Sequence, residues 1–180
     1  MHDDLEAIER VLANDRESFR LLVDRYQQPL LALIRKLTRS DTDHEGVAQD
    51  VFLAAFRCLA SFDPKRSTFS TWLFTITRNR CRNELSFRRP VSGVELPEPV
   101  NLRTPDRDAS ESEIFRHLDG ALGALPFEQR SVFVLSQLQG LSYGEVAYME
   151  GVGVGTVKSP IARAREKLQG LLRHLTEPRP

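Results

Sequence analysis

The chain is organised around the sequence LSYGEVAYMEGVGVGTVKSPIARAREKL, which runs from Leu141 to Leu168. Ser142 is followed three residues later by Glu145, a spacing at which each side chain can satisfy a backbone N–H of the other at a helix start. Gly151 follows this short helix and can adopt the left-handed conformation that ends it. The stretch therefore predicts a short capped helix, a tight turn and a second helix from about Val154.

The second helix is predicted to have one apolar and one basic side. The residues expected to face inward recur at helical spacing and are Val154, Val157, Ile161 and Leu168. The rest of its surface carries Lys158, Ser159, Arg163, Arg165 and Lys167. A capped helix, a glycine turn and a longer basic helix form a helix-turn-helix, whose second helix can enter the major groove of DNA.

Two alternatives compete with DNA binding. The helix pair could be a purely structural hairpin with solvated cations, but the cations cluster on the helix after the turn, which favours DNA. The run from Gly151 to Gly155 resembles a nucleotide-binding loop, which needs a preceding strand or a Lys directly after the last glycine. The preceding segment is helical in pattern and Lys158 comes three residues after Gly155, so we reject that interpretation.

The net charge limits how the chain can bind nucleic acid. Its 180 residues include 25 Lys and Arg against 25 Asp and Glu, and a hydrophobic fraction of 41% suffices for one domain or two small ones. Because phosphate neutralisation supplies most nonspecific affinity, a neutral chain should bind DNA weakly when alone. DNA binding must therefore rest on local basic patches or on a partner that contributes its own.

No catalytic residue, metal or cofactor is expected. Cys58 and Cys81 lie far apart without a C-x-x-C pattern, which is typical of small core residues in a reduced protein. The four His show no metal-ligand spacing, and no carboxylates form a recognisable acid–base arrangement. Without a signal peptide or an apolar run long enough to span a bilayer, we expect a soluble cytoplasmic protein with no membrane insertion.

The N-terminal part of the chain predicts four helices. They cover Leu5 to Ala13, a helix capped by Asn14 or Asp15 that reaches Leu37, a helix from Asp43 to about Ser61, and one from Trp72 to Arg89. Pro29 should kink the second helix rather than end it, because the apolar pattern continues beyond it. The third helix has an inward stripe of Val47, Val51, Ala54, Ala55, Cys58 and Leu59, with Gln49, Asp50, Leu53 and Arg57 partly outside it.

The fourth helix carries the densest basic patch of the chain, formed by Arg78, Arg80, Arg82, Arg88 and Arg89. Aromatic rings beside a basic helix suit unstacked bases, which need ring faces for stacking and cations along the backbone. The alternative is that Phe69, Trp72 and Phe74 are simply core residues, which we favour for Trp72 and at least one Phe. Trp72, Leu73, Ile76 and Leu85 can all point inward.

A proline-rich segment from Pro90 to about Ala109 lacks helical periodicity and is predicted to be a flexible linker. The overlapping stretch from Gly93 to Glu113 has six acidic residues against two basic ones, a net charge of −4. A second domain follows, with a helix from Ser110 to Leu122, another with Pro126 in its first turn, and the helix-turn-helix. The predicted fold is all-α: residues 1–89 and 110–180 form two small helical domains, and 90–109 join them.

Three segments together resemble the extracytoplasmic-function (ECF) sigma factors of bacterial RNA polymerase. They are VAQDVFLAAFRCLASFDP (Val47 to Pro64), STFSTWLFTITRNRCRNEL (Ser67 to Leu85) and ALPFEQRSVFVLSQLQGLSYGEVAYMEGVGVGTVKS (Ala124 to Ser159). The resemblance implies that the first domain binds a coiled coil of the largest polymerase subunit and opens the −10 promoter element. It implies that the second domain reads the −35 element as duplex DNA, and that the linker runs towards the RNA exit path.

The resemblance also assigns residues to each task. The positions for core RNA polymerase are Gln49, Asp50, Leu53 and Arg57. The positions for the single-stranded −10 element are Phe62, Lys65, Arg66, Ser67, Thr68, Thr75, Arg78, Asn79 and Arg82. The positions for the −35 duplex are Thr156, Lys158, Ser159, Ala162 and Arg163. An anti-sigma factor is the further partner that the family implies.

The main alternative function is a stand-alone helix-turn-helix regulator that binds operator DNA as a dimer. It explains Leu141 to Leu168 equally well, but it leaves the basic aromatic stretch from Thr68 to Arg89 without a role. No heptad run for dimerisation is recognisable. Specific DNA binding without polymerase would favour this alternative.

Pro160 departs from the family, which usually has a basic residue at this position. A proline beyond the first turn removes the hydrogen bond to the Thr156 carbonyl and crowds the preceding turn, at a cost of about 3 kcal/mol. We therefore expect a kinked or late-starting second helix and weak binding to the −35 element. Promoter choice would then depend more on the −10 contacts.

Overall fold

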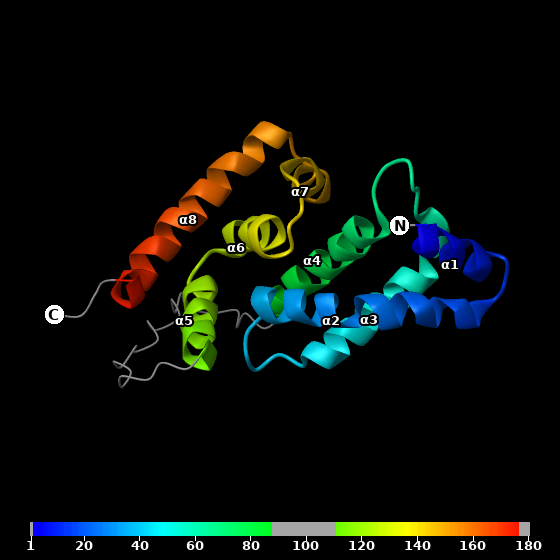
Figure 1. Cartoon of the computed structure of the whole chain (residues 1–180), viewed down its shortest axis with the longest axis horizontal. Helices are drawn as coiled ribbons and strands as arrows, with labels where there is room; N and C mark the ends of the chain where they lie inside the picture. The colour runs from blue at the N-terminus through cyan, green and yellow to red at the C-terminus, as the bar shows by residue number, and fades with distance from the viewer. Residues whose placement is uncertain (1, 88–110, 177–180) are drawn as a thin grey trace.

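Helices supply all regular secondary structure of the described residues, 2–87 and 111–176 of this computed structural model (Figure 1). The first half contains α1 (His2–Leu12), η1 (Arg16–Ser18), α2 (Phe19–Leu37), α3 (His44–Arg57), η2 (Leu59–Ser61) and α4 (Phe69–Phe87). The second contains α5 (Glu111–Gly123), α6 (Phe127–Phe133), the π-helical turn η3 (Val134–Leu138), α7 (Tyr143–Glu150) and α8 (Val154–Thr176). The all-α prediction is confirmed. The predicted linker, 90–109, lies entirely outside the described residues.

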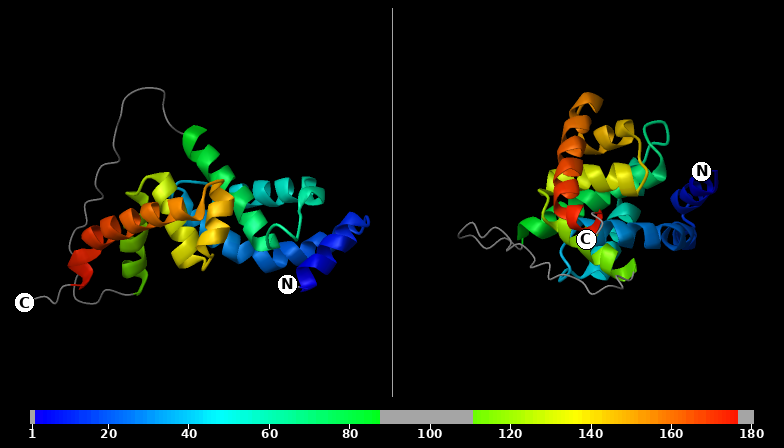
Figure 2. Two further views of the ribbon diagram at one scale, coloured as in Figure 1. Left: turned by 90° about the horizontal axis from the view of Figure 1, so that it is seen from above. Right: turned by 60° about the vertical axis from the view of Figure 1, so that its left-hand side comes forward.

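The two halves lie side by side along the long axis of the molecule. In Figures 1 and 2, α1 lies near one end, whereas α5 and the C-terminal part of α8 lie at the other. Within the second half, α8 packs on α5, α6 and α7. α7 packs against α4, so the helix-turn-helix contacts the first half directly.

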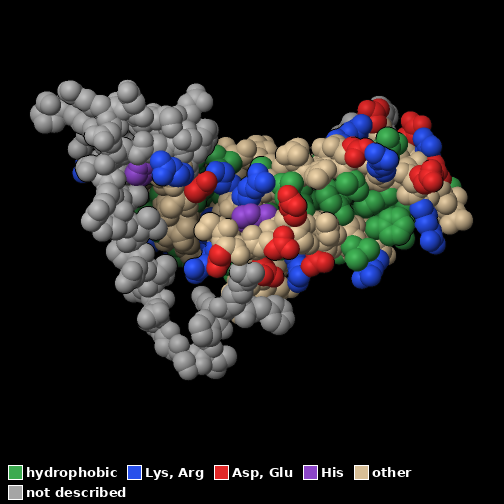
Figure 3. All heavy atoms as spheres, turned by 90° about the horizontal axis from the view of Figure 1, so that it is seen from below, with side chains coloured by type: hydrophobic (Ala, Val, Ile, Leu, Met, Phe, Trp, Pro, Cys, Tyr) green, Lys and Arg blue, Asp and Glu red, His purple; other side chains and the backbone are tan. Residues whose placement is uncertain are grey.

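On one face of the N-terminal half, hydrophobic side chains form a patch that charged side chains surround (Figure 3). Among the residues of this half whose burial is described, the exposed large apolar side chains are Leu12, Leu21 and Leu53. Isolated exposed leucines are ordinary, but a gathered apolar face is a feature of interaction surfaces.

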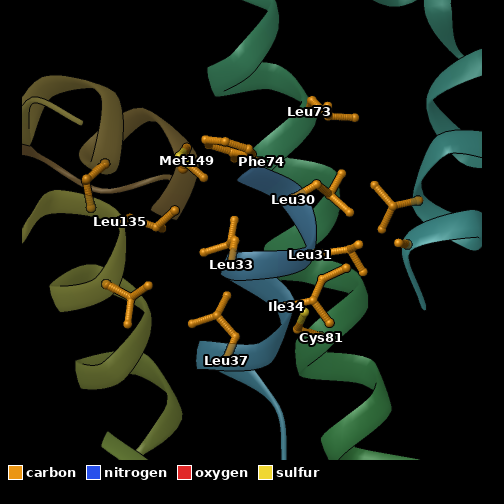
Figure 4. Packing of buried hydrophobic residues seen from close by; sticks show 14 of the residues in the cluster. Leu30, Leu31, Leu33, Ile34, Leu37, Leu73, Phe74, Cys81, Leu135 and Met149 are labelled. Carbon is orange, nitrogen blue, oxygen red and sulfur yellow. The ribbon is translucent and has the colours of Figure 1, made fainter. Parts of the chain in front are cut away.

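The core is centred on α2, a helix of the first half that contacts both α3 and α4 of its own half and α5, α6 and η3 of the second. Leu30, Leu33, Ile34 and Leu37 are completely buried. In Figure 4, Leu33 and Leu37 point towards the second half and Leu135, whereas Ile34 points towards α4. One continuous cluster of buried apolar residues therefore runs through both halves. Pro29 lies within α2 and does not end it, as expected.

Local capping explains where several helices begin. Asp43 accepts the N–H of Gly46 at 2.9 Å and caps α3 as expected, and Asp15 accepts the N–H of Ser18 at the start of η1. The expectation that the third helix continues to Ser61 is wrong. It ends at Arg57, and a short 3₁₀ turn, η2, follows.

The structure corrects the predicted inward stripe of α3. Ala54 and Cys58 are exposed, and Phe52 is buried instead. The prediction of two core cysteines is therefore right for Cys81 and wrong for Cys58. A stripe drawn from spacing alone assumes an unbroken helix, and Cys58 lies where the helix has already changed direction.

The helix-turn-helix forms as the sequence predicted. Ser142 and Glu145 make both hydrogen bonds of the capping box, and Gly151 ends α7 with φ 67° and ψ 30°. α8 begins at Val154 and continues through Pro160, so the alternative of a late-starting helix is wrong. Val154 was expected to face inward, yet it is 49% exposed, because the first turn of α8 extends beyond the body of the domain.

Candidate nucleic-acid and protein interfaces

The residues assigned to polymerase share the outer surface of α3. Gln49, Asp50, Leu53 and Arg57 are all exposed, and Leu53 keeps 47% of its surface accessible. Asp50 accepts a hydrogen bond of 2.5 Å from Arg80 of α4, which fixes its carboxylate beside the next helix. Burying a leucine stabilises an interface by about 1.5–3 kcal/mol, so Leu53 is suited to anchor a partner.

A shallow groove adjoins this part of α3 and was not predicted. It is lined by Arg16, Glu17, Phe19, Arg20, Val23 and Phe56. Phe56 follows Leu53 by three residues on α3 and packs edge-on against Phe19, with ring centroids 5.1 Å apart. Helical spacing could have shown that Phe56 lies near Leu53, but the pairing with α2 depends on tertiary packing.

The loop before α4 divides into exposed cations and structural residues. Lys65 and Arg66 are exposed. The Thr68 hydroxyl accepts the N–H of Thr71 at 3.2 Å, so it caps α4. Phe62 packs against Phe69 and Trp72, with ring centroids 5.7 and 5.6 Å away. The aromatic packing of Phe62 therefore anchors the loop, and Lys65 and Arg66 project from it into solvent.

The aromatic residues of α4 belong mostly to the core. Phe69 and Phe74 are buried, and Trp72 is half-buried. Tyr26 of α2 joins the cluster, with its ring 5.4 Å from that of Phe69. The interpretation of these rings as core is confirmed for the two phenylalanines, whereas Trp72 retains an accessible part.

The basic residues of α4 are placed in three different ways. Arg82 is exposed, and Arg80 pairs with Asp50. Arg78, assigned to the −10 element, is buried with its side chain only 4% exposed. Its guanidinium pairs with two carboxylates of the second half, Glu128 of α6 and Glu150 of α7. Arg88 and Arg89 lie outside the described residues.

The other residues assigned to α4 remain partly accessible. Thr75 and Asn79 are half-buried, and the Thr75 hydroxyl donates to the Thr71 carbonyl at 2.8 Å. The Asn79 side-chain oxygen accepts a bond of 3.4 Å from Arg78. The Asn79 amide nitrogen remains available to donate to a base edge.

Both carboxylates that reach α4 from α7 have shifted pKa values. Burial raises the pKa of Glu150, while the adjacent Arg78 guanidinium acts in the opposite direction. Burial also opposes ionisation of Glu145, but hydrogen bonds from Ser142 and Thr71 prevail and lower its pKa. The Thr71 hydroxyl donates the last of these at 2.8 Å.

The residues assigned to the −35 element form one exposed surface of α8. Thr156, Lys158, Ser159, Ala162 and Arg163 are all exposed. The opposite side is buried and consists of Val157, Ile161, Ala164 and Leu168. Arg165 and Lys167 turn back to their own domain, where they bond Gln137 and the Ala124 carbonyl at 3.0 and 2.9 Å. Within the described part of the chain, Lys158 and Arg163 form no ion pair.

Neither a metal site nor a membrane-spanning helix is found within residues 2–87 and 111–176. No group of three or more His, Cys, Asp or Glu side chains in these ranges could hold a metal ion. None of the helices there is long and apolar enough to cross a bilayer.

Two family models match the chain, sigma-70 region 2 over residues 22–90 and sigma-70 region 4 over residues 115–168. The ECF RNA polymerase sigma-E factor of Haemophilus influenzae is 33% identical, with 96% of each chain covered. The sigma-E factor of Escherichia coli is 35% identical over 92% of this chain and 94% of its own.

Solved structures match as well. The structure of CnrH in complex with the cytosolic domain of CnrY gives a TM-score of 0.73 at 31% identity, covering 96% of this chain and 98% of the other. The sigma factor RpoE of Bartonella quintana, solved with the anti-sigma factor NepR, gives a TM-score of 0.67 at 26% identity, covering 87% and 98%.

Proposed function

The chain belongs to the ECF sigma factors of bacterial RNA polymerase, and we propose that three separate surfaces of it carry out promoter-specific initiation. As an alternative sigma factor it directs transcription initiation. A stand-alone regulator is not favoured, because regions 2 and 4 both match, in order, within the one chain.

The first surface is the outer side of α3, which binds core polymerase. Gln49, Asp50, Leu53 and Arg57 supply a leucine anchor surrounded by polar side chains, an arrangement found at the centre and rim of protein interfaces. The neutral net charge supports dependence on this partner, since a chain without excess positive charge should bind DNA weakly when alone.

The second surface binds the unpaired −10 strand. Lys65, Arg66 and Arg82 provide cations, and the Asn79 amide nitrogen provides a donor for a base edge. Opening a duplex costs about 1.4 kcal/mol per base-pair step in lost stacking. Capture of an extruded base returns about 1–3 kcal/mol, so a protein that holds single strand can drive melting without catalytic residues. The chain therefore acts as a binding subunit and not as an enzyme.

The third surface is the outer side of α8, which binds the −35 duplex. The observation that carries this proposal is the segregation of all five assigned residues, Lys158 and Arg163 among them, on the exposed side of α8. The helix-turn-helix places such a side in the major groove.

An anti-sigma factor is the expected regulator in the cytoplasm. The support comes from the likeness to Bartonella quintana RpoE, which was solved with the anti-sigma factor NepR. Isolation of the chain from uninduced cells without any inhibitory protein would contradict this partnership.

Mobility shifts with and without core polymerase test the function. We expect specific promoter binding only with core enzyme, and Leu53→Asp should abolish its recruitment. Leu138→Asp, at an exposed leucine of η3, is the matched control and should bind core normally. Tight sequence-specific binding by the chain alone would contradict the proposal.

A further inference from the structure

The first helix, α1, lies outside the part of the chain that the region 2 model matches, residues 22–90. It packs against α2 and against η2, the short turn that precedes the loop proposed for the −10 strand. One acid of α1 is withdrawn from solvent, because Asp4 keeps only 8% of its surface exposed. A carboxylate in such a place needs partners within the protein, and α2 supplies two of them.

Asp4 fixes the position of the Tyr26 ring. Its carboxylate accepts the Tyr26 hydroxyl at 2.7 Å and pairs with the guanidinium of Arg25. The Tyr26 ring in turn lies edge-on to Phe69, with ring centroids 5.4 Å apart. Phe69 is 3% exposed and is the first residue of α4, directly after the loop. The first turn of α1 is therefore connected to the C-terminal end of the −10 loop through one tyrosine.

Aromatic packing joins that end of the loop to its other end. Phe62, the first loop residue, packs edge-on against Phe69, with ring centroids 5.7 Å apart. Trp72 lies 5.6 Å from Phe62 and 5.7 Å from Phe69. Because aromatic pairs prefer defined relative orientations, this packing holds the two ends of the loop in a fixed arrangement.

Between its ends the loop is shaped by its own hydrogen bonds. The Asp63 carboxylate accepts the Lys65 N–H at 2.9 Å, and the Asp63 carbonyl accepts the Arg66 N–H at 3.0 Å. These bonds form a local turn, so the orientation of the turn depends on where Phe62 and Phe69 lie. The exposed side chains of Lys65 and Arg66 follow that orientation.

We propose that Asp4 and Tyr26 are positioning residues for −10 binding, which act on the loop through the rings of Phe69 and Phe62. The proposal rests on the −10 role given to this loop above. Neither Asp4 nor Tyr26 belongs to the loop or to α4, so their effect on the strand is indirect. Binding groups must be held within about 0.5 Å of their productive geometry, and a small shift of the rings therefore suffices to weaken binding.

The salt dependence of promoter binding by the holoenzyme tests this role. Tyr26→Phe removes only the hydroxyl, and Asp4→Asn removes the charge that holds it. Each variant is assembled with core polymerase and titrated at several KCl concentrations with a promoter fragment whose −10 segment is single-stranded. Each phosphate contact of a single strand contributes about 0.7 to the slope of log affinity against log salt concentration.

Misplacement of the two loop cations should therefore lower this slope by about 0.7–1.4. The affinity at low salt should fall about two- to tenfold, as expected for loss of one hydrogen bond. The affinity for core polymerase should not change. A merely structural defect would reduce the fraction of active protein and leave the slope as it was.

Asp15→Asn is the matched control for a contact made by α1. The Asp15 carboxylate accepts the Arg10 guanidinium at 2.9 Å and the Ser18 hydroxyl at 2.6 Å, at the opposite end of α1 from Asp4. This variant should keep the slope of the unaltered chain. An equal decrease of the slope in Asp15→Asn would overturn the proposal, because any loosening of α1 would then have the same effect.

A double-substitution cycle tests the path through the rings. Phe62→Leu keeps an apolar side chain but removes the aromatic edge. Tyr26→Phe should lower the slope in the unaltered chain and have no further effect in the Phe62→Leu chain. Additive effects of the two substitutions would overturn the path through Phe62.

Lys65→Ala/Arg66→Ala distinguishes failure of the positioning from failure of the −10 role. If this variant lowers the slope while Tyr26→Phe and Asp4→Asn both leave it unchanged, the loop binds the strand and only the positioning is overturned. If this variant also leaves the slope unchanged, the loop does not bind the strand, and both assignments are overturned.

Discussion

At the start of α7, the side chains of Ser142 and Glu145 each accept a hydrogen bond from the backbone N–H of the other residue. The Ser142 hydroxyl accepts the Glu145 N–H at 3.2 Å, and the Glu145 carboxylate accepts the Ser142 N–H at 2.9 Å. The same carboxylate accepts the Thr71 hydroxyl of α4 through its other oxygen. One side chain thus caps the helix-turn-helix and joins it to the first half.

Loss of this cap should destabilise the protein. Ser142→Ala removes an acceptor for a helix N–H, which costs about 0.5–2 kcal/mol. Urea denaturation followed by circular dichroism measures the change. Ser86→Ala, at an exposed serine near the end of α4, is the control and should have little effect. Equal effects of the two substitutions would show that the cap contributes nothing measurable.

Stability should depend on the ionisation of Glu145. Since its folded-state pKa is lowered from 4.5, the charged form contributes stability that is present above this value. The contribution is lost as pH falls through the lowered pKa. Glu145→Gln should therefore be less stable than the unaltered chain at about pH 7, and the difference should shrink below about pH 4. A difference that stays constant over this range would contradict the role of the charge.

Asn79→Ala should impair promoter opening more than strand binding. If Asn79 captures an unpaired base, its loss removes part of the free energy that offsets melting. We expect loss of open complexes on duplex promoters and a smaller loss on a template with a pre-melted bubble, measured by permanganate footprinting. Asn83→Ala, at an exposed asparagine of the same helix, is the control. Equal losses on both templates would instead indicate a misfolded domain.

Substitutions at Pro160 distinguish the effect of helix stability on −35 binding from the effect of charge. α8 passes through Pro160, so one backbone hydrogen bond is absent there. Pro160→Ala and Pro160→Arg should both stabilise the protein, by up to about 3 kcal/mol. Only Pro160→Arg should also raise affinity for a −35 duplex, with a steeper salt dependence. If neither property rises, the proline belongs to the native geometry of α8 and its predicted cost is wrong.

Local chemistry explains which features could be predicted from the sequence. The capping box of α7, the Asp43 cap and Gly151 each depend on residues within one helical turn, and all three are confirmed. The outer sides of α3 and α8 are exposed as helical spacing predicts. These features depend on the local sequence and not on which elements pack against one another.

Long-range packing explains what could not be predicted. Spacing shows that Arg78 lies on a basic helix, but its acidic partners belong to α6 and α7. Val154 and Cys58 fit apolar stripes, yet one lies in the protruding first turn of α8 and the other beyond the end of α3. Periodicity specifies a face of a helix, whereas the opposing element decides whether that face is covered.

Promoter-directed transcription with purified components is the most direct test of sigma activity. Core RNA polymerase is incubated with genomic DNA of the source bacterium, with and without this chain, and the 5′ ends of the run-off transcripts are sequenced. We expect new start sites that share −10 and −35 elements, appear only when both proteins are present and disappear with Leu53→Asp. Absence of new start sites, together with specific DNA binding by the chain alone, would contradict the assignment.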